Sequence, residues 1–179
     1  MVTHNGVANS KIFSAAQLPA DVWVHFAFVF DDGGQNDQGQ AWLYINGVLN
    51  SSCGGALGNC WDGSGPQNRP YLLTPMNSPS ILTLGRFAAS PTGGFLNHYV
   101  GLLDEVRVWN VARTAKQIRQ NMNKTLNLRK ASGLVAYWRM NEGSGQVAAD
   151  GTGNGHDQQL GNTGGNDAAD PAWVSPGKP

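Results

Sequence analysis

Glutamate is nearly absent from this 179-residue chain, where it occurs only at Glu105 and Glu142. Long helices usually carry Glu and Lys on their solvent-facing sides, so this shortage argues against a mainly helical protein. Glycine, by contrast, occurs 24 times and proline nine times. Such a profile is typical of many short strands joined by turns, and we therefore expect an all-β protein.

Charge is also scarce. Asp, Glu, Lys and Arg together make up 13% of the residues, and the formal net charge is zero. A nucleic-acid-binding protein usually carries a basic patch or stripe, and the balanced composition gives no sign of one. Anionic membranes gain no support for the same reason. We expect no nucleic acid among the partners of this protein.

Long apolar runs are missing as well. The longest lie near residues 22–30 and 134–138, far short of the ~20 residues that a membrane-spanning helix needs. We therefore expect no membrane insertion. The N-terminus has no basic region followed by an apolar one, so it does not resemble a signal peptide. The expectation is a mature form, an expressed segment or a piece of a longer protein.

Cysteine is confined to Cys53 and Cys60, which flank a Gly-rich stretch. With no histidine nearby they are too few for a zinc site, which needs about four ligands. The stretch between them could close a small ring, so we predict a disulfide and hence an oxidising compartment. Two free thiols on a loop are the alternative.

Strands are expected where β-branched and aromatic residues gather. Residues 21–30 predict a strand buried on both faces. Asn46-Gly47 lies between apolar residues and predicts a β-hairpin, because a type I′ turn needs positive φ at both central residues. Further strands are predicted over residues 40–45, 48–49, 81–86, 99–109 and 133–140.

A single helix is predicted from Thr114 to about Met122. Thr114 and Gln117 have the spacing of a capping box. Ile118 and Met122, four residues apart, form one apolar stripe.

Three segments, taken in this order, resemble laminin-G-like domains of bacterial extracellular proteins, which have the concanavalin-A-like lectin/glucanase fold. The segments are residues 23–31 with 43–48, residues 82–86 with 101–114, and residues 133–145 with 149–157. The resemblance implies an antiparallel β-sandwich (jelly roll) with one short helix. It also implies an extracellular or cell-surface location.

One motif departs from the order usual in that family. The run Tyr137-Trp-Arg-Met-Asn-Glu-Gly-Ser-Gly145 resembles an element that opens many such domains, yet here it lies near the C-terminus. We expect one domain over residues 1–179, permuted or shortened. Residues 1–130 are then its main part, and residues 131–179 a returning strand, Gly-rich turn and tail. The alternative joins the end of one repeat to the beginning of the next, and its open sheet edge would favour self-association.

Calcium is the expected cofactor, in a structural role. Asp104 alternates with Val106 and Val108, so we expect it to be buried, and a buried carboxylate must be paired, hydrogen-bonded or metal-bound. The turn over residues 150–157 offers the oxygen ligands that Ca²⁺ prefers, and the resemblance implies a calcium near it. The candidate ligands are Asp104, Asp150, Asn154 and Asp157. The alternatives are a contact of Asp104 with backbone N–H groups or an arginine, and a tight turn with local hydrogen bonds.

Aromatic residues beside polar ones in predicted loops favour a shallow sugar-binding site, because binding sites combine aromatic surface with a few polar groups. The candidates are Trp61, Asp62, Asn68, Arg69, Tyr71, Phe95, His98 and Tyr99. The alternative is that these rings only cover the ends of the sandwich.

Signs of catalysis are weaker. A glycosidase needs two carboxyls at a set separation, but Asp104 and Glu105 are adjacent and should lie on opposite faces. Glu105 and Arg107 should share a face, which predicts an ion pair. No Gly-x-Ser-x-Gly elbow occurs. We therefore expect a module that binds a polysaccharide or glycan, or mediates adhesion. The rivals are a self-associating structural repeat and a glycan-degrading enzyme (glycoside hydrolase or polysaccharide lyase).

Overall fold

The structure is a computed structural model of the whole chain. It describes residues 18–31, 40–54, 60–61, 66–67, 82, 84–85, 87–88, 95–96, 99–161, 164–165 and 170–174. The chain divides into two compact units, residues 1–77 with 112–126 and residues 78–111 with 127–179.

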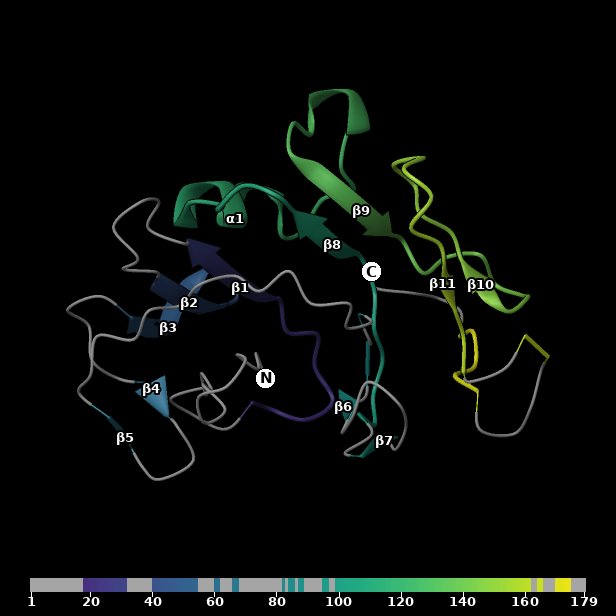
Figure 1. Cartoon of the computed structure of the whole chain (residues 1–179), viewed down its shortest axis with the longest axis horizontal. Coiled ribbons are helices and arrows are strands. Elements are labelled where there is room, and N and C mark those ends of the chain that lie inside the picture. The colour runs from purple at the N-terminus through teal and green to yellow at the C-terminus, as the bar shows by residue number, and fades with distance from the viewer. Residues whose placement is uncertain are drawn as a thin grey trace. The chain divides into compact units, whose positions relative to one another are not determined.

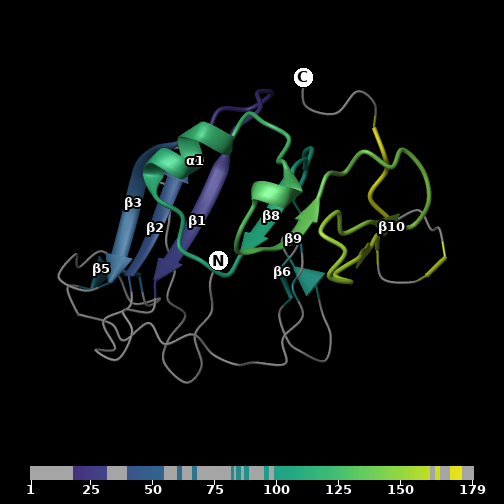
Figure 2. The same ribbon diagram turned by 90° about the horizontal axis from the view of Figure 1, so that it is seen from above.

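The first unit is built around a three-stranded antiparallel sheet. Strands β1 (Phe26–Asp31), β2 (Gln40–Ile45) and β3 (Val48–Gly54) lie side by side in that order (Figures 1 and 2). Among the sheet residues whose side chains the structure describes, Val29, Ala41 and Leu43 are buried. The first strand begins later than predicted, and Phe26 is 58% exposed, so the expectation of burial on both faces was wrong at this end.

The hairpin between β2 and β3 turns at Asn46-Gly47, as predicted. Both residues have positive φ, 49° and 74°, as a type I′ turn requires. The backbone N–H of His25 donates to Oδ1 of Asn46 (2.8 Å), and the Asn46 N–H donates to the His25 carbonyl (2.8 Å). The turn is therefore bonded to the residue that precedes β1. A further short pair, β4 (Cys60–Trp61) and β5 (Pro66–Gln67), belongs to the same unit.

The helix α1 (Ala115–Asn121) has the predicted capping box. The Gln117 N–H donates to Oγ1 of Thr114 (3.3 Å), and the Thr114 N–H donates to Oε1 of Gln117 (2.9 Å). Ile118 is buried. The guanidinium of Arg119 donates to the carbonyl of Gly47 (3.2 Å), so the helix contacts the hairpin turn.

The second unit is made of paired short strands, all antiparallel. Its core is formed by Ala136, Trp138 and Ala148, against which Val106, Val108, Leu84, Met140, Leu160 and Trp173 pack. The 3-10 helix η2 (Leu128–Lys130) precedes the second strand of the central pair. The pairs are β6 (Phe87–Ala88) with β7 (Phe95–Leu96), β8 (Val106–Trp109) with β9 (Leu134–Trp138), and β10 (Val147–Ala148) with β11 (Gln158–Gln159).

Two strands are shorter than predicted. The strand expected over residues 99–109 begins only at Val106, because Glu105 has a φ of 54° that takes it out of extended geometry. The strand expected over residues 133–140 ends at Trp138, and Met140 has a φ of 55°. The described residues of the range 81–86 lie outside any strand.

The displaced C-terminal motif has a partner within the chain. Strand β9, which carries Tyr137 and Trp138, pairs antiparallel with β8, with Val106 opposite Trp138 and Arg107 opposite Tyr137. The predicted fold class is confirmed: the described part of the chain is an all-β, jelly-roll-like structure of antiparallel strands with one short α-helix. Among the described residues, no helix is both long and apolar enough to cross a lipid bilayer.

Candidate binding surface

The Gly-rich turn after β10 is organised around the carboxylate of Asp150, which is 8% exposed. Its Oδ1 accepts hydrogen bonds from the N–H groups of Tyr137 (3.1 Å) and Thr152 (3.0 Å). Its Oδ2 accepts from the His156 N–H (3.3 Å), and the Thr152 hydroxyl lies 2.7 Å from the same oxygen. One buried carboxylate thus joins the turn to strand β9.

These hydrogen bonds decide the charge state of Asp150. Burial alone would raise the pKa of this carboxyl, because it disfavours the charged form. The hydrogen bonds from Thr152, and then those from Tyr137 and His156, outweigh burial and lower the pKa from 3.8 to about 2. Asp150 is therefore a structural anion at any ordinary pH.

The other two turn residues predicted as calcium ligands lie close to this carboxylate along the chain. Oδ1 of Asp157 accepts from the Asp150 N–H (2.7 Å), and the Asn154 side-chain amide donates to the Val135 carbonyl (2.8 Å). Asp104 is half-buried, and its Oδ1 accepts from the Glu105 N–H (2.9 Å). The turn therefore has the local hydrogen bonds that were the alternative to a calcium site there. Asp104 likewise has the contact with a backbone N–H that was its alternative to binding a metal.

The oxygens of Asp150 do not fit a calcium site in this arrangement, because the donors around them direct positive ends at the carboxylate. Within the described ranges, no three His, Cys, Asp or Glu side chains form a group that could hold a metal. Two other oxygens on the preceding loop suit a cation better: Glu142 Oε2 and Gln146 Oε1 are buried and accept no hydrogen bond from the described residues. A calcium near this turn stays a prediction.

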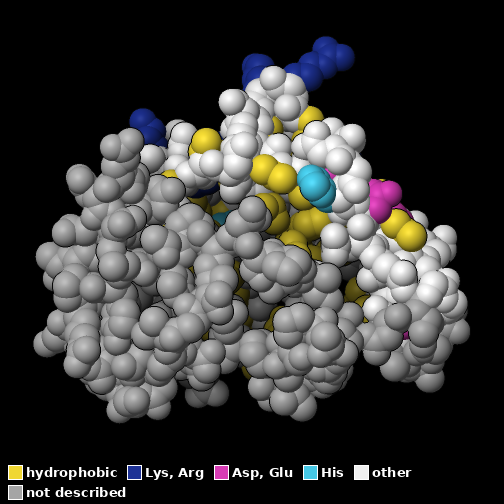
Figure 3. Space-filling view, in the orientation of Figure 1, with side chains coloured by type: hydrophobic (Ala, Val, Ile, Leu, Met, Phe, Trp, Pro, Cys, Tyr) yellow, Lys and Arg dark blue, Asp and Glu magenta, His cyan; other side chains and the backbone are white. Residues whose placement is uncertain are grey.

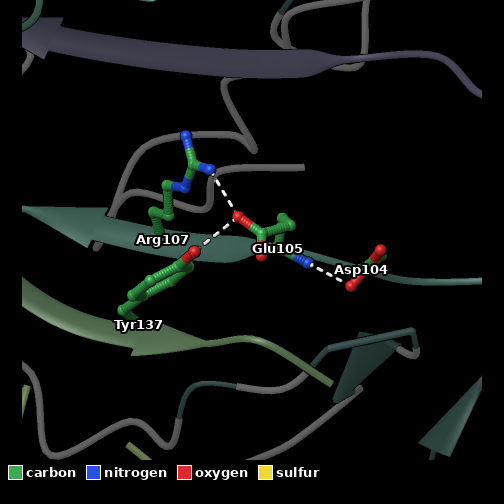
Figure 4. A network of polar contacts seen from close by, with 4 residues as sticks. All are labelled: Asp104, Glu105, Arg107 and Tyr137. Carbon is green, nitrogen blue, oxygen red and sulfur yellow. Dashed lines mark hydrogen bonds and ion pairs between the residues drawn. The ribbon is translucent and has the colours of Figure 1, made fainter. Parts of the chain in front are cut away.

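The predicted ion pair between Glu105 and Arg107 is confirmed, and a tyrosine joins it (Figure 4). Oε2 of Glu105 accepts from the Arg107 guanidinium and from the Tyr137 hydroxyl, each at 2.5 Å. The guanidinium also lies 5.3 Å from the centre of the Tyr137 ring. Because Tyr137 is 1% exposed and lies opposite Arg107, the network braces the β8–β9 pair.

Tyr99 is the predicted sugar-site residue whose side chain the structure describes, and its ring is 56% exposed. The Tyr99 N–H donates to the Gly85 carbonyl (2.6 Å), and the hydroxyl lies 3.4 Å from the Leu102 carbonyl. The ring covers Gly101, where an added Cβ would lie 2.5 Å from the Tyr99 hydroxyl. An exposed ring that is supported by its own backbone offers a flat surface for stacking.

The remaining predicted residues are placed less fully. Trp61 and Phe95 were expected in loops, but they lie in the short strands β4 and β7. Cys53 lies in β3 and Cys60 in β4, and these two strands are in contact. Their side chains are outside the description, so the disulfide stays a prediction. Outside the described residues altogether are Asp62, Asn68, Arg69, Tyr71 and His98.

Sequence reasoning missed Tyr137, which binds the carboxylates of Glu105 and Asp150, and Thr152, which binds that of Asp150. The backbone contact of Thr152 had a detectable signal, because an Asp in a turn typically accepts a hydrogen bond from the N–H two residues further on. Tyr137 had none, since its hydroxyl reaches Glu105 only in the observed register of β9 against β8, and its N–H reaches Asp150 only because the chain returns to β9 after β10.

Comparisons with known proteins agree on the fold. The family model described as the concanavalin A-like lectin/glucanases superfamily matches residues 1–119. A crystal structure of a candidate carbohydrate-binding protein from Bacteroides ovatus is similar over 79% of this chain, with a TM-score of 0.54 and 26% identity. The match covers 35% of the Bacteroides chain, so the present chain spans about a third of that protein. The comparison with curated proteins gives no match.

Proposed function

Because this chain belongs to the concanavalin A-like lectin/glucanase superfamily, we propose that it is a non-catalytic carbohydrate-binding module of an extracellular or cell-surface protein. The superfamily match over residues 1–119 carries the proposal. The similarity to a candidate carbohydrate-binding protein supports it. We also propose that the protein mediates adhesion and that Cys53 and Cys60 form a disulfide.

Tyr99 is the described residue that supports a location for the site. Sugars present C–H faces that stack on aromatic rings, and a ring held in place loses little freedom when it binds. Tyr99 is exposed and rests on Gly101. The predicted partners Phe95 and His98 precede it closely in the sequence.

The test is a pull-down of the purified chain with insoluble neutral polysaccharides, followed by an assay of the supernatant for new reducing ends. We expect depletion onto at least one glycan without sugar release. Tyr99→Ala should weaken the binding about tenfold, which corresponds to about 1.4 kcal/mol, since truncation of an aromatic residue that packs on the ligand typically costs more than about 1 kcal/mol. Tyr99→Phe is the matched control, because it keeps the ring. Release of reducing ends would instead identify a glycan-degrading enzyme.

Gly101→Ala tests whether the position of the Tyr99 ring matters, because it displaces the ring without removing it. The added Cβ would collide with the Tyr99 hydroxyl, so the ring must move although no group that contacts sugar is removed. We expect weaker glycan binding with unchanged circular dichroism. Binding equal to wild type would contradict a site at Tyr99.

The calcium proposal rests on the two buried oxygens of the loop before β10. Carboxylate and amide oxygens are calcium ligands, and Glu142 Oε2 and Gln146 Oε1 accept no hydrogen bond from the described residues. Added CaCl₂ should raise the melting temperature of the wild-type protein, and Glu142→Gln should abolish the rise. The same shift with MgCl₂, or none, would contradict the proposal.

Self-association is a second candidate role, and one observation favours it. The segment after Tyr99 exposes apolar side chains, with Val100 95%, Leu102 51% and Leu103 44% exposed. Exposed apolar runs often mark protein contacts. Sedimentation velocity over a hundredfold range of concentration tests this role. A protein that stays monomeric at every concentration would rule out self-association.

A further inference from the structure

Two adjacent cations, Arg129 and Lys130, lie on the short 3-10 helix η2, and both are exposed. The preceding residue, Leu128, is 43% exposed. Figure 3 shows Lys and Arg side chains standing out into solvent at the place where Figure 1 has the turn before β9. The turn therefore presents two neighbouring cations to any molecule that approaches from solvent.

The backbone around these cations is held by short-range hydrogen bonds. The Asn127 side chain accepts from the Arg129 N–H (3.1 Å), and the Asn127 carbonyl accepts from the Lys130 N–H (2.9 Å). Among the described residues, every hydrogen bond of residues 127–131 stays within residues 127–134. The turn can therefore open without breaking a hydrogen bond to a distant part of the chain, and such local opening costs less than global unfolding.

The chain is anchored again just after the turn. The Gly133 carbonyl accepts from the Asn110 N–H (2.9 Å), and a Cβ at Gly133 would lie 2.6 Å from the Val111 side chain. Strand β9 then pairs with β8, and Trp138 is buried in the core. Opening of residues 127–132 would leave these contacts in place.

Other exposed cations lie in backbone that is held more firmly. Lys116 and Arg119 belong to α1, which buries Ile118. The Lys124 N–H is bonded to the end of the same helix (3.2 Å). Arg139 directly follows β9, which pairs with β8. An endopeptidase cuts the transiently opened chain, so these sites require more unfolding than the turn does.

We propose that Arg129-Lys130 is a processing site for a trypsin-like endopeptidase, whose acidic pocket binds one Lys or Arg side chain. Hydrolysis breaks the peptide bond after Lys130. Water supplies the hydroxyl of the new Lys130 carboxyl group and a proton of the new Ala131 amino group. The site goes beyond carbohydrate binding, and its test contains no glycan, so the two proposals fail independently.

The cut chain remains assembled, because β8 lies before the cut and β9 after it. The two fragments, residues 1–130 and 131–179, are joined through this strand pair. Trp138 of the second fragment is 1% exposed in the core, and the Tyr137 hydroxyl donates to Glu105 of the first (2.5 Å). Cleavage thus changes the covalent structure of the second unit and keeps its core intact.

The test is limited trypsin digestion of the full chain, followed over time by intact mass. We expect the cut at Arg129-Lys130 to appear before a cut at any other described Lys or Arg. Low urea should speed this cut far less than it speeds global unfolding, because the turn exposes little surface when it opens. The fragments should co-elute with the intact chain in native size exclusion and separate in denaturing urea.

Variants separate recognition of the cations from opening of the turn. Arg129→Gln/Lys130→Gln should abolish the cut. The matched control, Lys116→Gln/Arg139→Gln, removes two exposed cations elsewhere and should be cut like wild type. Asn127→Ala removes the cap of η2 and keeps both cations. It should be cut about fivefold faster, since loss of a capping side chain favours the open turn, with an unchanged midpoint of urea denaturation.

Earlier cleavage in α1 or after β9 would overturn the inference. So would a cut at Arg129-Lys130 whose urea dependence matches that of global unfolding, or cleavage of Asn127→Ala at the wild-type rate. Fragments that come apart in native buffer would contradict the assembled two-chain form. Intact mass distinguishes all these cuts from those at cations outside the described residues, which are Lys11, Arg69, Arg86 and Lys178.

Discussion

The backbone N–H of Tyr137 donates to the carboxylate of Asp150, thirteen residues further along the chain. The bond joins the second half of β9 to the Gly-rich turn, and both groups are buried. The same tyrosine bonds through its hydroxyl to Glu105, before β8. Tyr137 therefore links the two carboxylates that shape this unit.

Asp150→Asn should destabilise the second unit by about 2–3 kcal/mol, since it removes a buried charged acceptor of several hydrogen bonds. The new amide would direct its own N–H groups at donors that now face the carboxylate. Urea denaturation measures the loss. Gln159→Glu is a surface control in β11, because Gln159 is exposed, and a loss below about 0.5 kcal/mol for Asp150→Asn would contradict the structure.

Stability should fall in acid within a defined window. Asp150 has a lowered pKa of about 2, against an ordinary value of 3.8. Its stabilising contribution is complete above pH 3.8 and is lost as the pH falls toward 2, because the unfolded chain takes up the proton first. The loss amounts to about 2 kcal/mol. Denaturation curves between pH 5 and 2 should show it in the wild type and not in Asp150→Asn.

Tyr137→Phe should cost about 1–2 kcal/mol, because a hydrogen bond to a charged carboxylate is lost while the ring remains. The expected signature is coupling with Glu105→Gln. In a double-mutant cycle, the two changes should be less than additive by at least about 0.5 kcal/mol. Strict additivity would mean that the hydroxyl contributes nothing through Glu105.

Gly47→Ala tests the contact between the hairpin and α1. Gly47 has a φ of 74°, and a Cβ there would lie 2.5 Å from Cγ of Arg119. We expect a loss of about 1–3 kcal/mol from backbone strain and collision together. Adding Arg119→Ala removes the collision and should restore part of that loss, since the strain remains. If the thermal melts show no recovery of stability in the double variant, the added Cβ does not collide with the Arg119 side chain.

Local patterns predicted local structure well. Asn46-Gly47 predicted the turn, and Thr114 with Gln117 predicted the helix start, because in both cases the determining bonds lie within a few residues. The pair Glu105–Arg107 predicted an ion pair, although the positive φ of Glu105 breaks the alternation on which that prediction rested. The start of β8 could not be predicted, since it depends on a side chain bonded across the sheet.

The total charge of the chain hides an uneven distribution of charge along the sequence. The zero net charge gave no sign of a basic patch, but it averages over two stretches of opposite sign. Charge counted in windows would have separated residues 106–141, which contain eight Lys and Arg residues and no Asp or Glu, from the acidic remainder. The exposure of these cations still required the structure, because helical and 3-10 geometry decide which of them point outward.

The pairing of β9 with β8 sets an order for synthesis on the ribosome. The sheet of the first unit needs only residues 26–54, which emerge early. The core of the second unit contains Trp138, Ala148 and Trp173, so β8 must wait, unpaired, while the next several dozen residues are translated. At roughly 5–20 residues per second, that wait lasts seconds. During it the apolar side of β8 is open to chaperones, and a stalled or truncated chain would keep that side exposed.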